Sequence, residues 1–167
     1  VYNSVFNSVQ FWDGRAAHLA AQAAGPMTAM PEMASTPELV EQRLKSIPAY
    51  VSEFKAAFNS DVSFELVTTA IGIFERTLVT PSRFDKFLEG DEAALNGAEK
   101  KGLKTFIDKG CATCHNGINL GGTLQPFEVA GKYEFANLGD FKGDANGLVK
   151  APTLRNIELT APYFHNG

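Results

Sequence analysis

The sequence predicts a mainly α-helical fold, and three observations carry this prediction. Over residues 63–79 apolar side chains recur every three or four positions, which is the period of one helix face. A second amphipathic stretch with the same period covers residues 98–109. Elsewhere, prolines, glycines and capping residues divide the chain into shorter helical runs.

The first half of the chain predicts four helices in succession. The first covers the alanine-rich residues 14–24, because the glycine–proline pair that follows is a strong stop signal. The proline- and methionine-rich residues 26–33 then form a loop. The second helix begins where Ser35 and Glu38 have the spacing of a capping box. A third begins at Pro48 and precedes the strongly periodic helix.

The second half of the chain predicts fewer regular elements. Glycine and asparagine punctuate residues 80–96, which indicates a domain boundary there. The helix at 98–109 follows, and its expected buried face consists of Leu103, Phe106 and Ile107. Residues 116–148 hold many glycines and no strong period, so we expect loops with short strands near 127–129 and 133–135.

The sequence GCATCHNG at 110–117 carries the motif with the clearest chemistry. Cys111 and Cys114 are the only cysteines, and His115 directly follows the second. This spacing places two thioether attachments and one iron ligand on a single turn, as a c-type haem requires. A zinc site would need a second ligand pair, and a thioredoxin-like pair would follow a strand. We therefore predict covalent haem c and, because such haems are attached outside the cytoplasm, a periplasmic location.

The iron ligand opposite His115 is not identified by these residues. Electron-carrier haems usually hold a methionine or a second histidine there. The methionines all lie far upstream, at Met27, Met30 and Met33. His18 reads as a helix-surface residue, whereas His165 could be a ligand, a hydrogen-bonding residue or part of the haem wall. Either the position is open to a small molecule, or its ligand lies beyond Gly167.

Composition argues against several classes of partner. The chain of 167 residues has 15 basic and 19 acidic side chains and a net charge of -4, which argues against nucleic acid and anionic membranes. No run approaches the roughly 18 consecutive apolar residues that cross a bilayer. A hydrophobic fraction of 44% is enough for a globular core.

Several long stretches of the chain resemble the bacterial dihaem cytochrome c peroxidases. The longest are QFWDGRAAHLAAQAAGP at 10–26 and APTLRNIELTAPYFHNG at 151–167, beside the haem motif itself. Shorter matches occur at 32–36 and 74–81, so the resemblance runs through nearly the whole chain. The haem motif alone would not identify this family.

The resemblance implies two cytochrome c-like haem domains, both incomplete in this sequence. Residues 1–82 would be the remainder of the N-terminal, peroxidatic domain, and residues 83–167 the truncated C-terminal, electron-transferring domain. The first haem motif is then expected before Val1, and the methionine ligand of the second haem after Gly167. We expect such a fragment to attach one haem of the two and to be inactive alone.

The resemblance also assigns roles to individual residues. Glu32 matches the distal carboxylate of the peroxide pocket, with Gln22 and Pro26 beside it, and Trp12 matches a tryptophan between the two haems. His115 would be the proximal ligand of the electron-transferring haem. Judged by residue type alone, Glu32 is a solvated loop residue, Gln22 a helix-surface residue and Trp12 a core aromatic.

A calcium ion is the second metal that the resemblance implies. The backbone carbonyls of Thr160 and Pro162 match ligands of a calcium ion at the domain interface, and carbonyl oxygen suits that hard cation. Alone, both are turn residues. Arg155 fits two roles equally well, a partner for a haem propionate and a member of a structural salt bridge.

The function implied by the resemblance is the reduction of hydrogen peroxide to water in the periplasm. Electrons would come from a small redox protein, a cytochrome c or a cupredoxin, and the enzyme would be a homodimer. Two alternatives stay open. One is a monohaem electron-transfer protein that uses residues 90–167, and the other is a dihaem enzyme that oxidises a protein side chain.

Overall fold

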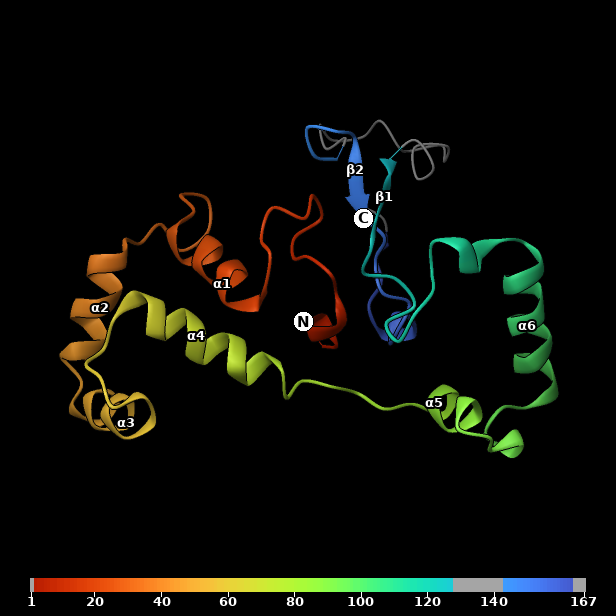
Figure 1. Cartoon of the computed structure of the whole chain (residues 1–167), viewed down its shortest axis with the longest axis horizontal. Helices are drawn as coiled ribbons and strands as arrows, with labels where there is room; N and C mark the ends of the chain where they lie inside the picture. Colours follow the sequence, from red (N-terminus) through yellow and green to blue (C-terminus); the bar gives the residue numbers. More distant parts are fainter. Residues whose placement is uncertain (1, 128–142, 164–167) are drawn as a thin grey trace. The chain divides into compact units, whose positions relative to one another are not determined.

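The computed structural model describes residues 2–127 and 143–163, and helices dominate these ranges (Figure 1). The prediction of a mainly α-helical fold is confirmed. The strands predicted near 127–129 and 133–135 lie, apart from residue 127, outside the described residues. No helix in the described ranges is long and apolar enough to cross a membrane.

The chain packs into two compact units. Unit 1 consists of residues 1–15 and 78–167, and unit 2 of residues 16–77. The two units are defined by how this chain packs on itself, and they are not an assignment of haem domains. The assignment of residues 1–82 and 83–167 to two haem domains remains a prediction.

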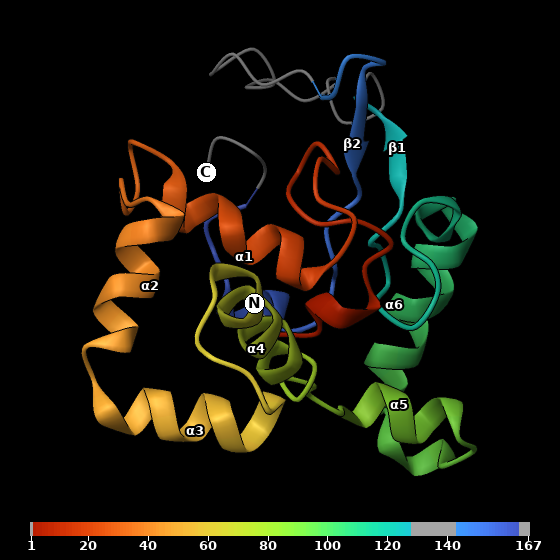
Figure 2. The ribbon, with the colours of Figure 1, turned by 60° about the vertical axis from the view of Figure 1, so that its left-hand side comes forward.

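Unit 2 is a group of four helices around one apolar core. The helices are α1 (Leu19–Thr28), α2 (Pro37–Lys45), α3 (Pro48–Phe58) and α4 (Phe64–Glu75). The buried cluster at the centre of this core consists of Met27, Phe54, Val62 and Val67. Helices α1 and α4 lie side by side, as both views of the ribbon show (Figures 1 and 2).

Three of the four helices in unit 2 begin at a side-chain cap, and the exception is α3, which begins at Pro48. The Ser63 hydroxyl accepts a hydrogen bond from the Leu66 N–H at 3.3 Å and begins α4. At α2 the cap is Thr36, which accepts from the Leu39 N–H at 3.2 Å. The predicted capping box at Ser35 is therefore wrong by one residue, because Pro37 occupies the first helical position.

Helix α1 differs most from its predicted extent of 14–24. It begins at Leu19, where the His18 Nδ1 accepts from the Ala21 N–H at 3.2 Å, so His18 is a helix cap. It also continues through Pro26 to Thr28. A proline inside a helix removes one N–H donor, here the usual partner of the Gln22 carbonyl. The burial of Met27 in the core of unit 2 compensates for that loss.

Gly72 marks the close approach of α4 to α1. A Cβ built at Gly72 would lie 2.9 Å from the Ala20 backbone nitrogen, whereas one at Gly102 in unit 1 would meet nothing within 4 Å. We expect Gly72→Ala to lower the free energy of unfolding by about 1–2 kcal/mol, because overpacking outweighs the gain in helix propensity. Gly102→Ala, the matched control, should raise it by up to about 1 kcal/mol. Denaturant titration of the two variants measures both changes, and equal effects would contradict the close approach.

Unit 1 combines short helices with a two-stranded ribbon. Its elements include α5 (Arg83–Leu88), α6 (Gly97–Asp108), β1 (Leu124–Pro126) and β2 (Leu148–Lys150). The strands are antiparallel, with Gln125 opposite Val149 (Figure 2). Single 3-10 turns occur at Ser4–Phe6, Glu92–Ala94, Cys111–Thr113 and Ile157–Leu159.

The N-terminal segment joins unit 1 through Asn3. This residue is 1% exposed, and its N–H donates to the Leu78 carbonyl at 2.8 Å. Its side chain donates to the Thr80 hydroxyl at 2.7 Å and accepts from the Thr80 N–H at 2.9 Å. Three hydrogen bonds of one buried asparagine thus connect the first residues of the chain to residues 78–80.

Candidate functional site

Helix α6 leads the chain into the turn that carries the two cysteines. It begins with a capping box in which Asn96 and Glu99 each accept from the other's N–H, at 2.9 and 2.8 Å. After its end, Gly110 takes a left-handed conformation with φ +78° and redirects the chain. The N–H groups of Cys114 and His115 both donate to the Cys111 carbonyl, at 3.3 and 3.0 Å. The three residues of the motif therefore lie on one turn.

The two cysteines form no disulfide, and both side chains can be reached from outside. Cys111 is exposed and Cys114 is half-buried. The Cys114 thiol lies 3.7 Å from the Gln125 side-chain oxygen on β1, to which it donates a weak hydrogen bond. Two accessible thiols on one turn are what the formation of two thioether bonds needs.

His115 is oriented by a backbone carbonyl. Its Nδ1 lies 3.1 Å from the Leu120 carbonyl oxygen. Because a carbonyl only accepts hydrogen bonds, Nδ1 carries the proton and Nε2 is left as the free lone pair. The Phe106 ring of α6 lies beside the imidazole, with ring centroids 6.4 Å apart. This arrangement suits His115 to be an iron ligand through Nε2.

The carbonyl that contacts His115 belongs to a strained segment. Leu120 has φ +48°, a left-handed conformation that a residue with a Cβ rarely adopts. Gly121 and Gly122 follow with φ of +146° and +91°. A Cβ at Gly121 would overlap the Pro152 carbonyl oxygen. Our sequence reasoning missed the role of Leu120, and the adjacent glycine pair is the signal that could have found it.

The surroundings of the motif fit a large apolar cofactor. None of the three α6 residues predicted to be buried is fully buried: Leu103 and Phe106 are half-buried, and Ile107 is 57% exposed. Ile118, just after the motif, is 59% exposed. Apolar side chains left open beside a cysteine–histidine turn are what a porphyrin would cover.

The residues predicted for the peroxide pocket all belong to unit 2. Gln22 and Pro26 lie on α1, and Glu32 lies in the loop after it. That loop folds back on the end of the helix, where the N–H groups of Ala29, Met33 and Ser35 donate to successive carbonyls at 2.9, 3.1 and 2.9 Å. The Met33 bond goes to the Pro26 carbonyl. Glu32 therefore extends into solvent from an ordered backbone close to Pro26.

The methionines have different environments in this structure. Met27 is a helical core residue that is 8% exposed, so its prediction as part of a loop is wrong. Met30 and Met33 are exposed by 81% and 65%. His165, the other candidate for the iron, lies outside the described residues. The two interpretations of the second axial position thus remain open.

Trp12 lies in a segment of unit 1 that is held by a backbone hydrogen bond to β2 and by contacts between its neighbouring side chains. Its carbonyl accepts from the Lys150 N–H of β2 at 2.7 Å, and its side chain is 40% exposed. Beside it, Phe11 has φ +64° and the Arg15 guanidinium stacks 3.5 Å from the centre of the Phe11 ring. Arg15 also contacts both carboxylate oxygens of Asp13, at 2.9 and 3.0 Å.

Thr160 and Pro162 lie on an exposed turn of unit 1. The Thr160 N–H donates to the Ile157 carbonyl at 3.3 Å, and the Ala161–Pro162 peptide is cis. Within the described ranges no group of three or more His, Cys, Asp or Glu side chains could hold a metal ion. A calcium ion at this turn would therefore depend on carbonyl ligands, and it stays a prediction.

Arg155 forms a structural salt bridge rather than an exposed contact. Its two terminal nitrogens donate to the two oxygens of Asp85 at 2.9 and 2.5 Å, and its side chain is 9% exposed. Hydrogen bonds to the Asp85 carboxyl hold its pKa well below the usual range. The largest effect comes from Arg155, and smaller effects come from the N–H and hydroxyl of Ser82. Of the two roles predicted for Arg155, the structure has the salt bridge.

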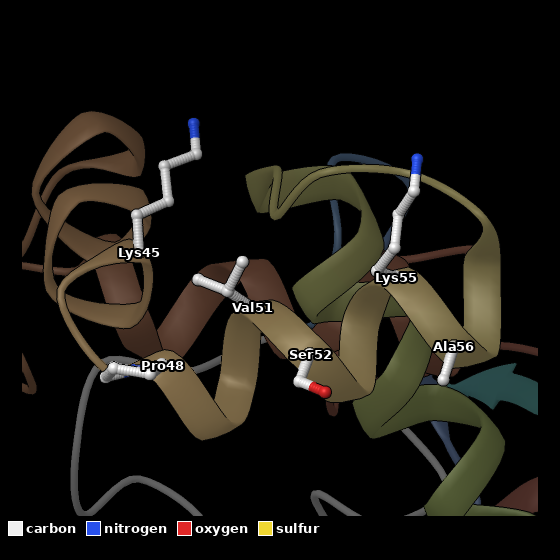
Figure 3. Close-up of a pocket in the computed structure, with 6 residues that line it drawn as sticks. All are labelled: Lys45, Pro48, Val51, Ser52, Lys55 and Ala56. Carbon is white, nitrogen blue, oxygen red and sulfur yellow. The ribbon is translucent and has the colours of Figure 1, made fainter.

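An open hollow of about 700 Å³ lies on unit 2, away from the predicted site residues of that unit. Val51 forms its floor, and the side chains of Lys45 and Lys55 both point outward on the same side (Figure 3). No carboxylate, histidine or cysteine lines it. The hollow therefore offers neither an acid–base group nor an iron ligand.

The fold and the site together define a class of protein. Two cysteines and a histidine on one turn, with the imidazole fixed through Nδ1 and open apolar surface nearby, are the attachment site of a c-type haem protein.

Comparisons with known proteins identify the family within this class. The family model described as "Di-haem cytochrome c peroxidase" matches residues 1–93. Among curated proteins, the chain is 51% identical to the cytochrome c551 peroxidase of Pseudomonas aeruginosa and 50% identical to that of Nitrosomonas europaea. Both matches cover 100% of this chain, and 52% and 53% of the relatives. It is 36% identical to the methylamine utilization protein MauG of Methylorubrum extorquens, of which it covers 50%.

The chain belongs to the di-haem cytochrome c peroxidase family. Membership implies haem c as its prosthetic group, in agreement with the motif at Cys111. The chain spans about half the length of the curated relatives it matches.

Proposed function

We propose that the full-length protein reduces hydrogen peroxide to water with electrons from a small redox protein. The haem attached at Cys111 and Cys114 would relay these electrons to a second haem. The chain contains only these two cysteines, so a second c-type haem would be attached by residues outside this sequence. The observation that carries the proposal is the site at His115, oriented for iron within a chain that is 51% identical to a cytochrome c551 peroxidase.

The proposed reaction consumes one peroxide, two electrons and two protons, and it forms two water molecules. When bound, the haem groups supply the redox chemistry. The part that this chain's residues would perform is proton transfer. Glu32 would take a proton from one peroxide oxygen and return it to the other, so that water can leave. Its exposed carboxylate, on a loop with an ordered backbone, supports this role.

Gln22 and Pro26 would complete the same pocket. Both lie on the helix that precedes the Glu32 loop, and the Met33 N–H connects this loop to the Pro26 carbonyl at 3.1 Å. We propose that Gln22 binds peroxide by hydrogen bonds, while Pro26 fixes the turn that presents Glu32. Movement of the loop would then alter the pocket directly.

The remaining assignments concern electron supply and assembly. Trp12 would lie on the electron route between the haems, and the segment held by Phe11, Asp13 and Arg15 supports a fixed position for it. We further propose two haems, a calcium ion held by the carbonyls of Thr160 and Pro162, a homodimer and a periplasmic location. The donor would be a cytochrome c or a cupredoxin.

Peroxide consumption by the full-length protein tests the proposal. With a reduced cytochrome c or cupredoxin as donor, we expect two donor molecules to be oxidised for each peroxide consumed. A haem-loaded protein that transfers electrons but does not consume peroxide would favour the monohaem electron-carrier alternative. If a protein side chain is oxidised in place of the donor, the result would favour the other alternative, a dihaem enzyme that oxidises a protein side chain. The higher identity to the two cytochrome c551 peroxidases than to MauG favours peroxide reduction.

A further inference from the structure

The short loop after the haem motif is held from several sides. It runs from Asn116 to Gly122 and contains the Leu120 carbonyl that contacts His115. Within the loop, the Leu120 N–H donates to the Gly117 carbonyl at 3.0 Å, and the Gly121 N–H donates to the Asn116 carbonyl at 3.0 Å. These local bonds do not explain the strained conformation of Leu120, so contacts from elsewhere must maintain it.

Arg155 supplies one of these contacts. Its Nε donates to the Ile118 carbonyl at 2.6 Å, while its other two nitrogens are fixed by Asp85. Asp85 is itself held by the Ser82 N–H at 2.6 Å. The guanidinium is a planar fork, so fixing two of its nitrogens also fixes the direction of the third. The loop is thereby tied to α5 through the side chain of Arg155.

Thr153 and Asn119 supply a second contact. Asn119 is 1% exposed, and its side-chain nitrogen donates to the Asn7 side-chain oxygen at 2.6 Å. The Thr153 hydroxyl lies 2.7 Å from the Asn119 backbone oxygen and 2.9 Å from its side-chain oxygen. The same hydroxyl accepts from the Arg155 N–H at 3.1 Å. The two contacts therefore meet at Thr153, whose hydroxyl holds Asn119, the residue directly before the strained Leu120.

We propose that Thr153, Arg155 and Asn119 are positioning residues that hold the Leu120 carbonyl against the His115 Nδ1 and so lower the reduction potential of the attached haem. The proposal rests on the haem-attachment part of the proposed function and not on peroxide turnover. A hydrogen bond from Nδ1–H makes the imidazole a stronger electron donor, which favours the oxidised iron. If the Leu120 carbonyl moves away from Nδ1, this hydrogen bond is lost and the reduction potential rises.

Thr153→Val tests the proposal without a change of charge. Valine has the shape of threonine but cannot donate to Asn119 or accept from the Arg155 N–H. In the full-length, haem-loaded protein we expect the reduced-to-oxidised ratio of this haem at a fixed potential to rise about tenfold, equivalent to ~59 mV. We also expect the His115 Nδ1 proton to exchange faster with solvent, as measured by NMR.

Thr105→Val is the matched control. Its hydroxyl donates to the Lys101 carbonyl at 2.9 Å on the exposed side of α6, in the same unit but away from the loop. Neither the potential nor the exchange rate should change in this variant. If Thr153→Val melts earlier but keeps the wild-type potential and exchange rate, the residue is only structural and the proposal is overturned.

A second variant covers the case in which Thr153→Val does not fold. Arg155→Lys keeps the charge but loses the planar fork, and the same two measurements apply to it. An unchanged potential in Arg155→Lys would equally overturn the proposal. Absence of haem from the wild-type protein would instead contradict the proposed function, and its absorption spectrum shows this before any variant is made.

Discussion

Replacing Glu32 by glutamine is expected to lower the turnover of peroxide by about 10²- to 10⁴-fold in the full-length protein. Glutamine keeps the size and polarity of the side chain but cannot accept and return a proton, and this is the usual contribution of a general acid–base group. Steady-state kinetics with a reduced donor measures the effect. The absorption spectra of the haems should stay nearly unchanged.

The structure indicates that this substitution leaves the fold intact. Among the described residues, the Glu32 side chain is exposed and forms no hydrogen bond, so stability should change by less than about 0.5 kcal/mol. Glu53→Gln is the matched control, because it also removes one exposed carboxylate, on α3. Unchanged turnover in Glu32→Gln would remove Glu32 from the mechanism, and an equal loss in Glu53→Gln would point to a general effect of charge.

A methyl group added at Gly121 should unfold the loop behind the haem motif. The new Cβ would overlap the Pro152 carbonyl oxygen, and φ +146° disfavours any L side chain. We expect Gly121→Ala to lower the free energy of unfolding by about 3 kcal/mol or more, because a steric clash and backbone strain add. Loss of the Leu120 carbonyl from His115 should also reduce the yield of haem-loaded protein.

Gly117→Ala is the control that separates the steric clash with Pro152 from the cost of a positive φ. Gly117 also has a positive φ, of +70°, but a Cβ there would meet nothing within 4 Å. Its cost should therefore be the left-handed conformation alone, about 1–2 kcal/mol. Chemical denaturation and the haem absorbance per protein measure both variants. Similar losses in the two would show that Pro152 does not pack against Gly121.

Local signals were sufficient for much of the helical structure. The three- and four-residue period over 63–79 predicts α4 and its start, which the Ser63 hydroxyl fixes, but the helix ends at Glu75, four residues before the predicted end. Pro48 correctly marks the start of α3. Both depend on residues within one or two turns of the helix, which a sequence displays directly. Helix α1 is different, because the core contact of Met27 keeps a helix intact across Gly25 and Pro26.

The candidate site was predictable only as far as its chemistry is local. Cysteine spacing identifies the attachment turn, since its three residues, Cys111, Cys114 and His115, lie within one short stretch of the sequence. The Leu120 carbonyl depends on a left-handed leucine, which residue type disfavours. The pair of Asp85 and Arg155 joins residues 70 positions apart, and no local pattern indicates such a partner. Both features depend on the tertiary fold.

The hydrogen bonds of Asn3 have a consequence for the order in which the protein folds. Unit 2 is one continuous stretch, residues 16–77, whereas unit 1 needs residues from both sides of it. On a ribosome, the helices of unit 2 can pack as soon as they emerge, but Asn3 must wait for Leu78 and Thr80. Pairing across so long a loop is slow and entropically costly. Asn3 therefore reaches its native partners only after the whole of unit 2 has been synthesised.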